Sequence, residues 1–367
     1  MNEHCALILS GHLGAGHDVV AEACADALSP HGVKSRVLDA MELLGRAGGP
    51  AGDAVFKTLF WRPTVYDGFH FSHLRRGSRV ARGLDRLAVR NIWPRFMKHF
   101  ESTRPDLLIS VFATGAATAA RLRRERDDDV LSVVLCTDTW LHRMWVHDET
   151  DLFLVTSQTA AESVHAYRPR ASVEIVPAPA RPAFYDAPSR SEARAMFEVP
   201  DDARCVLLMS GAWGVGPIDE VALRLSRAGL FVLAVAGRNR KFERKLGSLA
   251  KSNPSIRPFG FTEQVPELMA ACDVVVTSSG DTCTEARVVG RGMVLLDVVP
   301  GHGRENLMHQ LELGNAAVCM PDPATIADAV MAFLDDPARS EPPPVRSRDA
   351  WEAPFLAALD RIGYSLD

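Results

Sequence analysis

One stretch of 34 residues, from Asp273 to Asn306, restricts the fold of this chain more than any other. It reads DVVVTSSGDTCTEARVVGRGMVLLDVVPGHGREN: a short apolar strand, a turn of small residues, a helix that carries Glu285, a second apolar strand and a loop. In open parallel sheets, ligands bind beyond the carboxyl ends of the strands. The turn and the helix N-terminus suit diphosphate oxygens, and Glu285 suits ribose hydroxyls. The stretch predicts an α/β fold with a nucleotide site, and an ordinary turn of a parallel sheet is the alternative.

The length of 367 residues predicts two domains, each with its own core. The seven cysteines are scattered and form no CxxC pair, which indicates reduced thiols and a cytoplasmic protein. The first residues do not have the pattern of a signal peptide, and no apolar run approaches the ~20 residues of a spanning helix. We therefore expect any contact with a membrane to be peripheral, on the inner face of the cell membrane.

The N-terminal half begins with an apolar run, CALILS, followed by GHLGAGH and a helical pattern, which together indicate a strand, a glycine loop and a helix. Gly11, Gly14 and Gly16 do not have the GxGxxG spacing, so a nicotinamide cofactor is not expected. His17 lies where the loop enters the helix. It could take a proton from a hydroxyl near neutral pH, or it could simply line the turn.

Residues 56–100 differ in composition from the rest of the chain. They hold nine of its 26 aromatic residues, and ten Lys or Arg against two Asp. Such a segment is typical of a surface that meets anionic lipid, or that shapes an acceptor pocket. A helical hairpin with core aromatics and solvated arginines is the alternative. A nucleic acid partner is not expected, because no binding module is present and the remainder is acidic.

A second group of polar and aromatic residues follows the apolar run that ends at Cys136. The segment TDTWLHRMWVH contains Asp138, His142, Trp145 and His147, and it should project beyond the same sheet edge as His17. A metal site is conceivable, but the five-residue spacing of the histidines does not place both on one helical face. We therefore predict substrate contacts and no metal.

The second half restarts after a proline-rich connector, VPAPARPAFYDAP, that marks the domain boundary. An apolar run leads into a loop with Gly211, Gly214 and Gly216 and a helix opened by Pro217, which indicates a second phosphate cradle. The predicted domains are residues 1–178, which bind the acceptor, and 190–335, which bind the nucleotide. Residues 336–367 are predicted to form a tail and a helix that packs across the two domains.

Six motifs resemble the diacylglycerol glycosyltransferases, a family of bacterial processive glucosyltransferases and plant monogalactosyldiacylglycerol synthases related to MurG-type enzymes. They are GAGH at 14–17, TDTWLHRMWVHDETD at 137–151, MSGAWGVGPI at 209–218, GFTEQVPELMAACDVVVT at 260–277, SGDTCTEA at 279–286 and PGHGREN at 300–306. The resemblance covers most of the chain. It implies a GT-B fold: two Rossmann-like domains with parallel sheets that face a central cleft.

The resemblance also implies roles for individual residues. His17 resembles the catalytic base. The implied acceptor contacts are Gly16, Asp138, His142, Trp145 and His147. The implied donor contacts are Gly211, Gly214, Gly216, Val265, Ser279, Gly280, Thr282, Glu285, His302 and Asn306, with Val265 recognising uracil through its backbone and Glu285 binding the ribose.

Three departures from the family concern the donor site. His302 and Gly303 stand where relatives carry Gln-Glu, Trp213 adds bulk to the loop with Gly211, Gly214 and Gly216, and SSGDT replaces a lysine-containing turn. The predicted function is inverting transfer of a sugar from a nucleotide-sugar, expected to be UDP-linked, to a hydroxyl of a lipid or small molecule, without cofactor or metal. A soluble specialised acceptor, an epimerase and a nucleotide-sugar-binding protein without turnover are the alternatives.

Overall fold

The computed structural model describes residues 4–11, 16–45, 63–75, 77–126, 129–209, 217–336 and 346–366. The chain forms two compact units. Unit 1 comprises Met1–Pro179, Pro300–Glu305 and Arg348–Asp367, and unit 2 comprises Ala180–Val299 and Asn306–Ser347. The chain therefore enters unit 1 a second time for the six residues from Pro300 to Glu305.

The core of unit 1 is a parallel sheet in the order β2-β1-β3-β4-β5-β6. Its strands are β1 (Cys5–Ser10), β2 (Lys34–Asp39), β3 (Leu107–Ser110), β4 (Leu131–Cys136), β5 (Leu152–Val155) and β6 (Val173–Ile175). The central strands are almost continuously apolar because helices cover both faces of parallel sheets. The predicted first strand coincides with β1.

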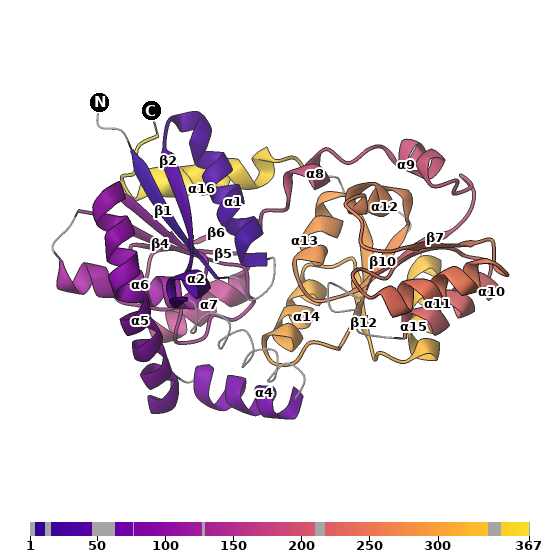
Figure 1. The fold of residues 1–367 in the computed structure, drawn as a ribbon, viewed down its shortest axis with the longest axis horizontal. Helices are drawn as coiled ribbons and strands as arrows, with labels where there is room; N and C mark the ends of the chain where they lie inside the picture. The colour runs from indigo at the N-terminus through magenta and orange to yellow at the C-terminus, as the bar shows by residue number, and fades with distance from the viewer. Residues whose placement is uncertain are drawn as a thin grey trace. The chain divides into compact units, whose positions relative to one another are not determined.

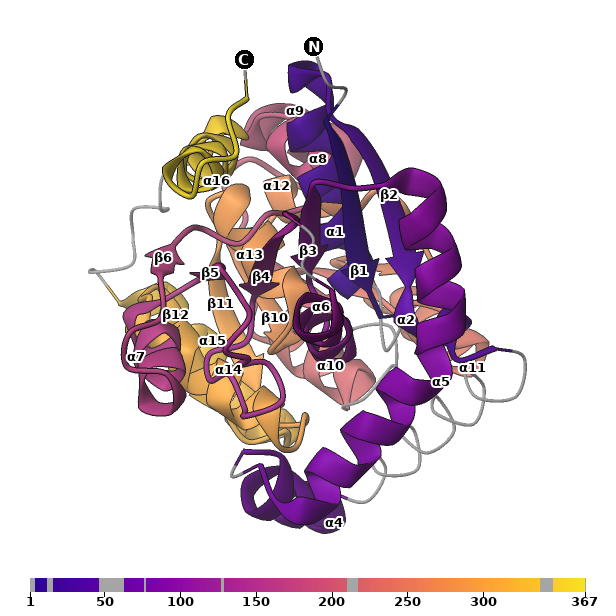
Figure 2. The same ribbon diagram turned by 90° about the vertical axis from the view of Figure 1, so that its left-hand side faces the viewer.

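The helices of unit 1 are α1 (Gly16–Leu28), α2 (Ala40–Leu43), α4 (Pro63–Phe69), a π-helix (His70–Leu74), α5 (Arg79–Thr103), α6 (Ala113–Glu125), α7 (Gln158–Tyr167) and α16 (Asp349–Arg361), with a 3-10 turn at Ser29–His31. Of these helices, α1, α2, α5, α6 and α7 contact strands of this sheet. Figure 2 shows α5 and α6 beside each other next to the strands, with α4 near the start of α5. Ile92, Phe96 and Leu122 of these helices form a cluster with Leu7 and Leu108 of the sheet.

The C-terminal helix α16 belongs to unit 1. It contacts α1, and it buries Trp351, Phe355 and Leu359. Just beyond it, the Tyr364 hydroxyl lies 3.3 Å from a carboxylate oxygen of Asp106.

Unit 2, drawn from magenta-red to yellow in Figure 1, contains a second parallel sheet. Its strand order is β12-β11-β10-β7-β8-β9. Its strands are β7 (Cys205–Met209), β8 (Phe231–Val235), β9 (Ile256–Phe259), β10 (Val274–Ser278), β11 (Gly292–Leu296) and β12 (Ala316–Cys319). Its helices are α8 (Pro182–Tyr185), α9 (Arg190–Met196), α10 (Ile218–Arg227), α11 (Arg240–Ala250), α12 (Val265–Ala271), α13 (Asp281–Val288), α14 (His302–Glu312), which starts in unit 1, and α15 (Pro323–Asp335).

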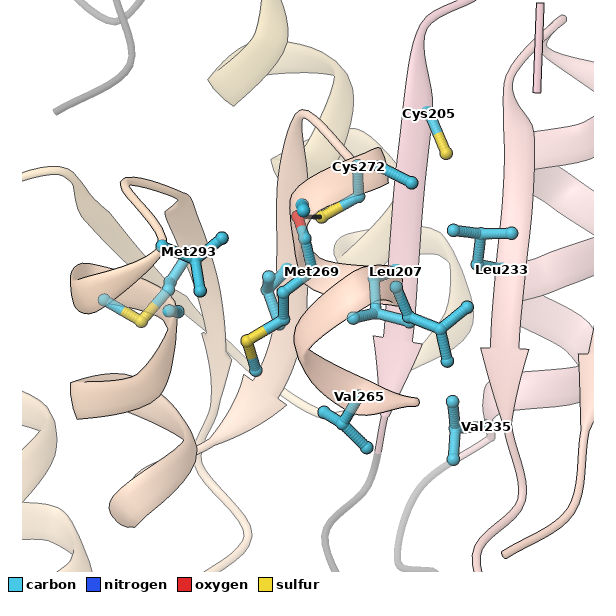
Figure 3. Packing of buried hydrophobic residues seen from close by; sticks show 14 of the residues in the cluster. Cys205, Leu207, Leu233, Val235, Val265, Met269, Cys272 and Met293 are labelled. Carbon is cyan, nitrogen blue, oxygen red and sulfur yellow. Dashed lines mark hydrogen bonds between the residues drawn. The ribbon is translucent and has the colours of Figure 1, made fainter. Parts of the chain in front are cut away.

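Two apolar clusters lie on opposite faces of this second sheet. One joins α9, α12 and α13 to alternate residues of the strands, such as Leu207 and Met293, and the other joins α10 and α15 to the intervening residues. Figure 3 shows Val265 and Met269 of α12 against Leu207 of β7. The predicted strand, turn, helix and strand of residues 273–306 are β10, the turn at Ser278–Gly280, α13 and β11.

Both strand orders contain a switch point, where consecutive connections run to opposite sides of the sheet. In unit 1 it lies between β1 and β3, and in unit 2 between β7 and β10. Ligands of open α/β sheets bind at the carboxyl ends of such strand pairs. Each unit therefore offers one such position.

For residues 56–100, of which 56–62 and 76 lie outside the described residues, two aromatic side chains agree with the alternative in which the aromatics are core residues. Phe96 and Phe100 are core residues of unit 1, so these aromatic side chains do not form an interfacial surface. The exposed apolar side chains of this segment are aliphatic: Val65, Val80, Leu84 and Leu87. In the described ranges, no helix has the length and apolar character needed to cross a bilayer.

Candidate functional site

His17 lies at the switch point of unit 1. It is the second residue of α1, which follows the carboxyl end of β1, and it is half-buried. Its ring centroid lies 5.2 Å from that of Phe112, which follows β3, and 6.5 Å from that of Trp145, which lies beyond β4. A Cβ atom at Gly11 would lie 2.4 Å from the Phe112 ring, so this loop needs a glycine there.

A chain of aromatic rings continues from Trp145 through the site. The centroid separations are 6.3 Å from Trp145 to His142, 6.4 Å from His142 to His70, and 6.3 Å from His70 to His302. The structure thus brings His17, His142, Trp145 and His302 together, although they come from three distant parts of the sequence. The sequence analysis did not predict His70 as a site residue, and its side chain is buried, with 2% of the residue exposed.

Two of these imidazoles are held in the neutral form. Burial lowers the pKa of His142 to about 4, although the nearby carboxylate of Asp138 acts in the opposite direction. Burial also lowers the pKa of His302, again against the charge of Asp138. A neutral imidazole has one donor and one acceptor nitrogen. The site therefore offers directed hydrogen bonds to a substrate and does not concentrate positive charge on these two side chains.

The segment Pro300–Glu305 is attached to α4 and the π-helix by polar contacts within unit 1. The Gly301 amide donates to Asp67 Oδ1 at 2.5 Å. Glu305 lies 3.0 Å from His70 Nε2 and 3.0 Å from Arg75 Nη1. Arg75 also stacks on Trp140, with 4.2 Å from Cζ to the ring centroid.

Sequence reasoning missed Asp67, His70 and Arg75. More than 220 residues separate each of them from its partner in the segment Pro300–Glu305. No local pattern in the sequence marks such pairs.

The remaining residues predicted for the acceptor side are also near this site. Gly16 opens α1. His147 Nε2 lies 2.9 Å from the Met144 carbonyl oxygen, so this ring is engaged within its own loop. Among the described residues, no three His, Cys, Asp or Glu side chains are arranged to hold a metal ion.

The predicted donor residues lie in unit 2, around its own switch point. Ser279, Gly280 and Thr282 form the turn and first residues of α13 after β10. Val265 is the first residue of α12, where backbone amides have no partner within the helix. Gly211, Gly214 and Gly216 lie outside the described residues, but the strand before them is β7, the other strand of the switch point.

Glu285 has a partner that the sequence did not reveal. Its carboxylate accepts a hydrogen bond from Arg181 Nε at 2.8 Å, and its side chain is 6% exposed against 48% for Arg181. Burial raises the pKa of Glu285, and Arg181 counteracts that shift. A ribose hydroxyl that donates to the Glu285 carboxylate would do so beside the hydrogen bond from Arg181. Asn306 follows Glu305 in α14 and is the first residue of the chain's return to unit 2.

Residues 87–168 match the family model described as Monogalactosyldiacylglycerol (MGDG) synthase. The match covers less than half of the chain. It includes β3, β4 and the loop with Asp138, His142 and Trp145.

The chain has relatives among named glycosyltransferases. A probable chloroplastic MGDG synthase of Glycine max is 28% identical over 58% of this chain and 42% of its own length. A processive diacylglycerol beta-glucosyltransferase of Bacillus licheniformis is 27% identical over 64% of this chain and 61% of its own. A processive diacylglycerol beta-glucosyltransferase of Bacillus cereus is 24% identical, over 91% of this chain and 86% of its own length. The chain thus spans less than two thirds of the first two relatives.

Solved structures identify the fold as GT-B. MurG of Acinetobacter baumannii superposes with a TM-score of 0.63 at 13% identity over 98% of both chains. A UDP-GlcNAc 2-epimerase of Neisseria meningitidis superposes with a TM-score of 0.61 at 10% identity, over 98% of this chain and 100% of its own. Since transferases and epimerases share this fold, the fold does not choose between them.

Proposed function

We propose that the protein is an inverting glycosyltransferase that transfers a sugar from a uridine diphosphate sugar to a hydroxyl group of a diacylglycerol-type lipid. The observation that carries the proposal is the position of His17 at the switch point of unit 1, beside the loop of the segment that matches the MGDG synthase model. The named activities of the relatives support the substrate classes.

In the proposed reaction, His17 accepts the proton of the attacking hydroxyl. The hydroxyl oxygen forms a bond to the anomeric carbon while the bond from that carbon to the diphosphate breaks, which inverts the anomeric configuration. Nucleoside diphosphate leaves with the electron pair of the broken bond. General-base assistance of this kind is worth about 10²–10⁴ in rate.

The donor is proposed to bind to unit 2. The turn Ser279–Gly280, Thr282 and the N-terminus of α13 would stabilise the growing charge on the diphosphate, since helix N-termini and small-residue turns favour phosphate. Val265 would contact the uracil through its backbone, and Glu285 would bind the ribose. We propose that the reaction needs neither a metal ion nor a cofactor, because these groups can meet the charge.

The first experiment measures sugar transfer with purified protein, UDP-glucose or UDP-galactose, and diacylglycerol in mixed micelles. His17→Ala should reduce kcat by about 10²–10⁴. His165→Ala, on the exposed side of α7, serves as the matched control and should leave kcat unchanged. A product that keeps the donor's anomeric configuration would refute inversion, and an unaffected His17→Ala variant would remove its role as base.

Donor binding is tested separately by thermal stabilisation. A UDP-sugar at about 100 times its dissociation constant should add ~2.7 kcal/mol of stability. Glu285→Ala should lose most of this gain. If the wild type shows no stabilisation by any nucleotide-sugar, the proposed donor site is wrong.

A lipid acceptor requires access to a membrane, and we propose that α5 provides it from the cytoplasmic side. Val80, Leu84 and Leu87 follow the i, i+4, i+7 pattern of one helix face and are 53–55% exposed. Exposed arginines lie alongside this apolar stripe at Arg79, Arg82, Arg86 and Arg90. An apolar face with flanking basic residues is the arrangement of interfacial helices that bind anionic lipid.

The membrane contact is tested by sedimentation with vesicles of phosphatidylglycerol and phosphatidylcholine. Replacing the three stripe residues by serine should weaken binding about tenfold or more, because each aliphatic side chain would lose roughly 1 kcal/mol of burial. The control carries serine at three exposed apolar positions elsewhere: Val37, Ile175 and Met196. Equal losses in the two variants, or no binding by the wild type, would contradict the contact and favour a soluble acceptor.

A further inference from the structure

Tyr66 and His302 form a partly buried pair within unit 1. The Tyr66 hydroxyl lies 3.0 Å from His302 Nδ1, and the two rings meet edge to face at an interplanar angle of 86°. Tyr66 is 7% exposed. The pair brings together residues 236 positions apart in the sequence.

The backbone that carries His302 is held independently of this hydrogen bond. Asp67 accepts hydrogen bonds from the Gly301 amide and, at 2.7 Å, from Arg304 Nη1. Gly301 has a φ of 63°, in the left-handed region, and a Cβ atom there would lie 2.5 Å from the Tyr66 ring. The His302 ring therefore has a defined position against Tyr66.

Both side chains of this pair are neutral near pH 7. Burial raises the pKa of Tyr66 far above neutrality, so its phenol stays protonated and can donate. Burial lowers the pKa of His302, so its ring is neutral near pH 7. A phenol that donates to Nδ1 leaves the hydrogen of the neutral ring on Nε2. Within the described part of the chain, no hydrogen bond joins Nε2 to the protein.

His302 also lies near the reacting groups of the proposed function. Its electrostatic neighbours include Asp138, His70 and His17, the proposed base. The rings of Trp145, His142 and His70 connect His17 to His302, so the proposed base and the His302 ring belong to one group of neighbouring side chains.

We propose that Tyr66 donates to His302 Nδ1 and thereby orients His302, so that its Nε2–H donates a hydrogen bond to an oxygen atom of the substrate that reacts beside His17. This inference rests on the proposed function. His302 is then a substrate contact that takes a hydroxyl or phosphate oxygen and rejects an amide N–H at the same position. Tyr66 is a positioning residue.

Two substitutions of His302 separate its two nitrogens. A glutamine amide nitrogen occupies the place of Nε2, and an asparagine amide nitrogen that of Nδ1. His302→Gln should keep the KM of its substrate within about threefold of the wild type. His302→Asn should raise it about tenfold, the usual effect of losing one substrate hydrogen bond. A higher KM in His302→Gln than in His302→Asn would overturn the proposal.

The KM values for the nucleotide-sugar and for the lipid acceptor are measured separately. If only the KM for the nucleotide-sugar rises in His302→Asn, the oxygen atom that accepts from His302 belongs to the donor. If only the KM for the lipid rises, that oxygen atom belongs to the acceptor. If neither KM nor either dissociation constant changes in His302→Asn, the contact does not exist.

The role of Tyr66 is tested by nitrogen NMR of the histidine side chains, with the His302 signals assigned by their loss in His302→Gln. The wild type should show the Nε2–H form, and its Nε2 signal should shift when substrate is added. Tyr66→Phe should broaden or mix the two tautomers and raise the affected KM, while Tyr364→Phe, which removes another tyrosine hydroxyl of unit 1, should do neither.

An Nδ1–H wild type would overturn the proposal whatever the activity. The tautomer is observed without turnover, so a wild type with Nε2–H and a substrate-dependent shift but no sugar transfer would contradict the proposed function alone.

Discussion

Arg194 provides the sharpest test of how unit 2 is held together. Its side chain is 0% exposed. The guanidinium donates to the carbonyl oxygens of Ala271 at 3.1 Å, Pro200 at 2.8 Å and Asp201 at 2.7 Å, and it pairs with Asp273 at 3.0 Å. It therefore links α9 to the end of α12 and to the residue before β10.

We expect Arg194→Met to lower the free energy of opening of unit 2 by about 3–5 kcal/mol, the range for removal of one partner from a buried ion pair. Three carbonyl acceptors lose a donor at roughly 1 kcal/mol each, and the charged contact adds to that. Asp273 keeps its bonds to Arg190 Nη2 at 2.7 Å and to the Cys205 amide at 2.8 Å. Because Asp273 keeps these partners, the fall in the free energy of opening should lie in the lower half of the range of about 3–5 kcal/mol.

The assay is native-state hydrogen exchange, read by mass spectrometry on peptides that cover β7 and β10. Protection there should fall by the predicted free energy, while peptides of β1 and β3 serve as an internal reference. The control is Arg190→Met, which removes an arginine from the same carboxylate but at a side chain that is 43% exposed. An exposed pair is worth about 0–1 kcal/mol. If the two variants lose equal protection, or Arg194→Met loses less than about 1 kcal/mol, the reasoning is refuted.

Three further predictions concern unit 1. The pKa of His142 falls from about 6.5 in the unfolded chain to about 4, so its contribution to stability is complete above pH 6.5 and is lost as the pH falls toward 4; in a thermal melt series, His142→Gln should flatten this loss. Gly301→Ala should lower kcat/KM about tenfold or more through strain at positive φ and the clash with Tyr66, whereas Gly68→Ala, which meets no atom within 4 Å, should not. Under native conditions a thiol reagent should modify Cys5, which is half-buried, well before Cys24, whose pKa is raised by complete burial; equal rates would contradict the described packing.

Much of the local structure could be predicted because it depends on neighbours in sequence. The apolar run at residues 5–10 is β1, and the pattern of residues 273–306 is a strand, a turn, a helix and a strand in the predicted order. Strand and helix periods are local properties, so short windows of sequence carry them. The position of His17 at a sheet edge followed from the same rule, since a residue after a parallel strand must lie at its carboxyl end.

The basic and aromatic segment shows where composition is insufficient. Its charge and aromatic content left two alternatives open, an interfacial surface and a helical hairpin with core aromatics. In the structure Phe96 and Phe100 are in the core, and the exposed stripe is aliphatic. Composition counts residues but does not assign them to faces. The helix phase, which places Val80, Leu84 and Leu87 on one side, depends on which face of α5 packs on the sheet.

The sequence alone determined the elements, their order and the residues that follow each strand, because these depend on local propensity and spacing. Only the tertiary structure decided which of those residues meet. It placed Tyr66 against His302, Glu305 against His70, and Arg181 against Glu285, pairs separated by 236, 235 and 104 positions. Such contacts form when distant segments pack and buried polar groups must find partners, and no short-range pattern encodes that requirement.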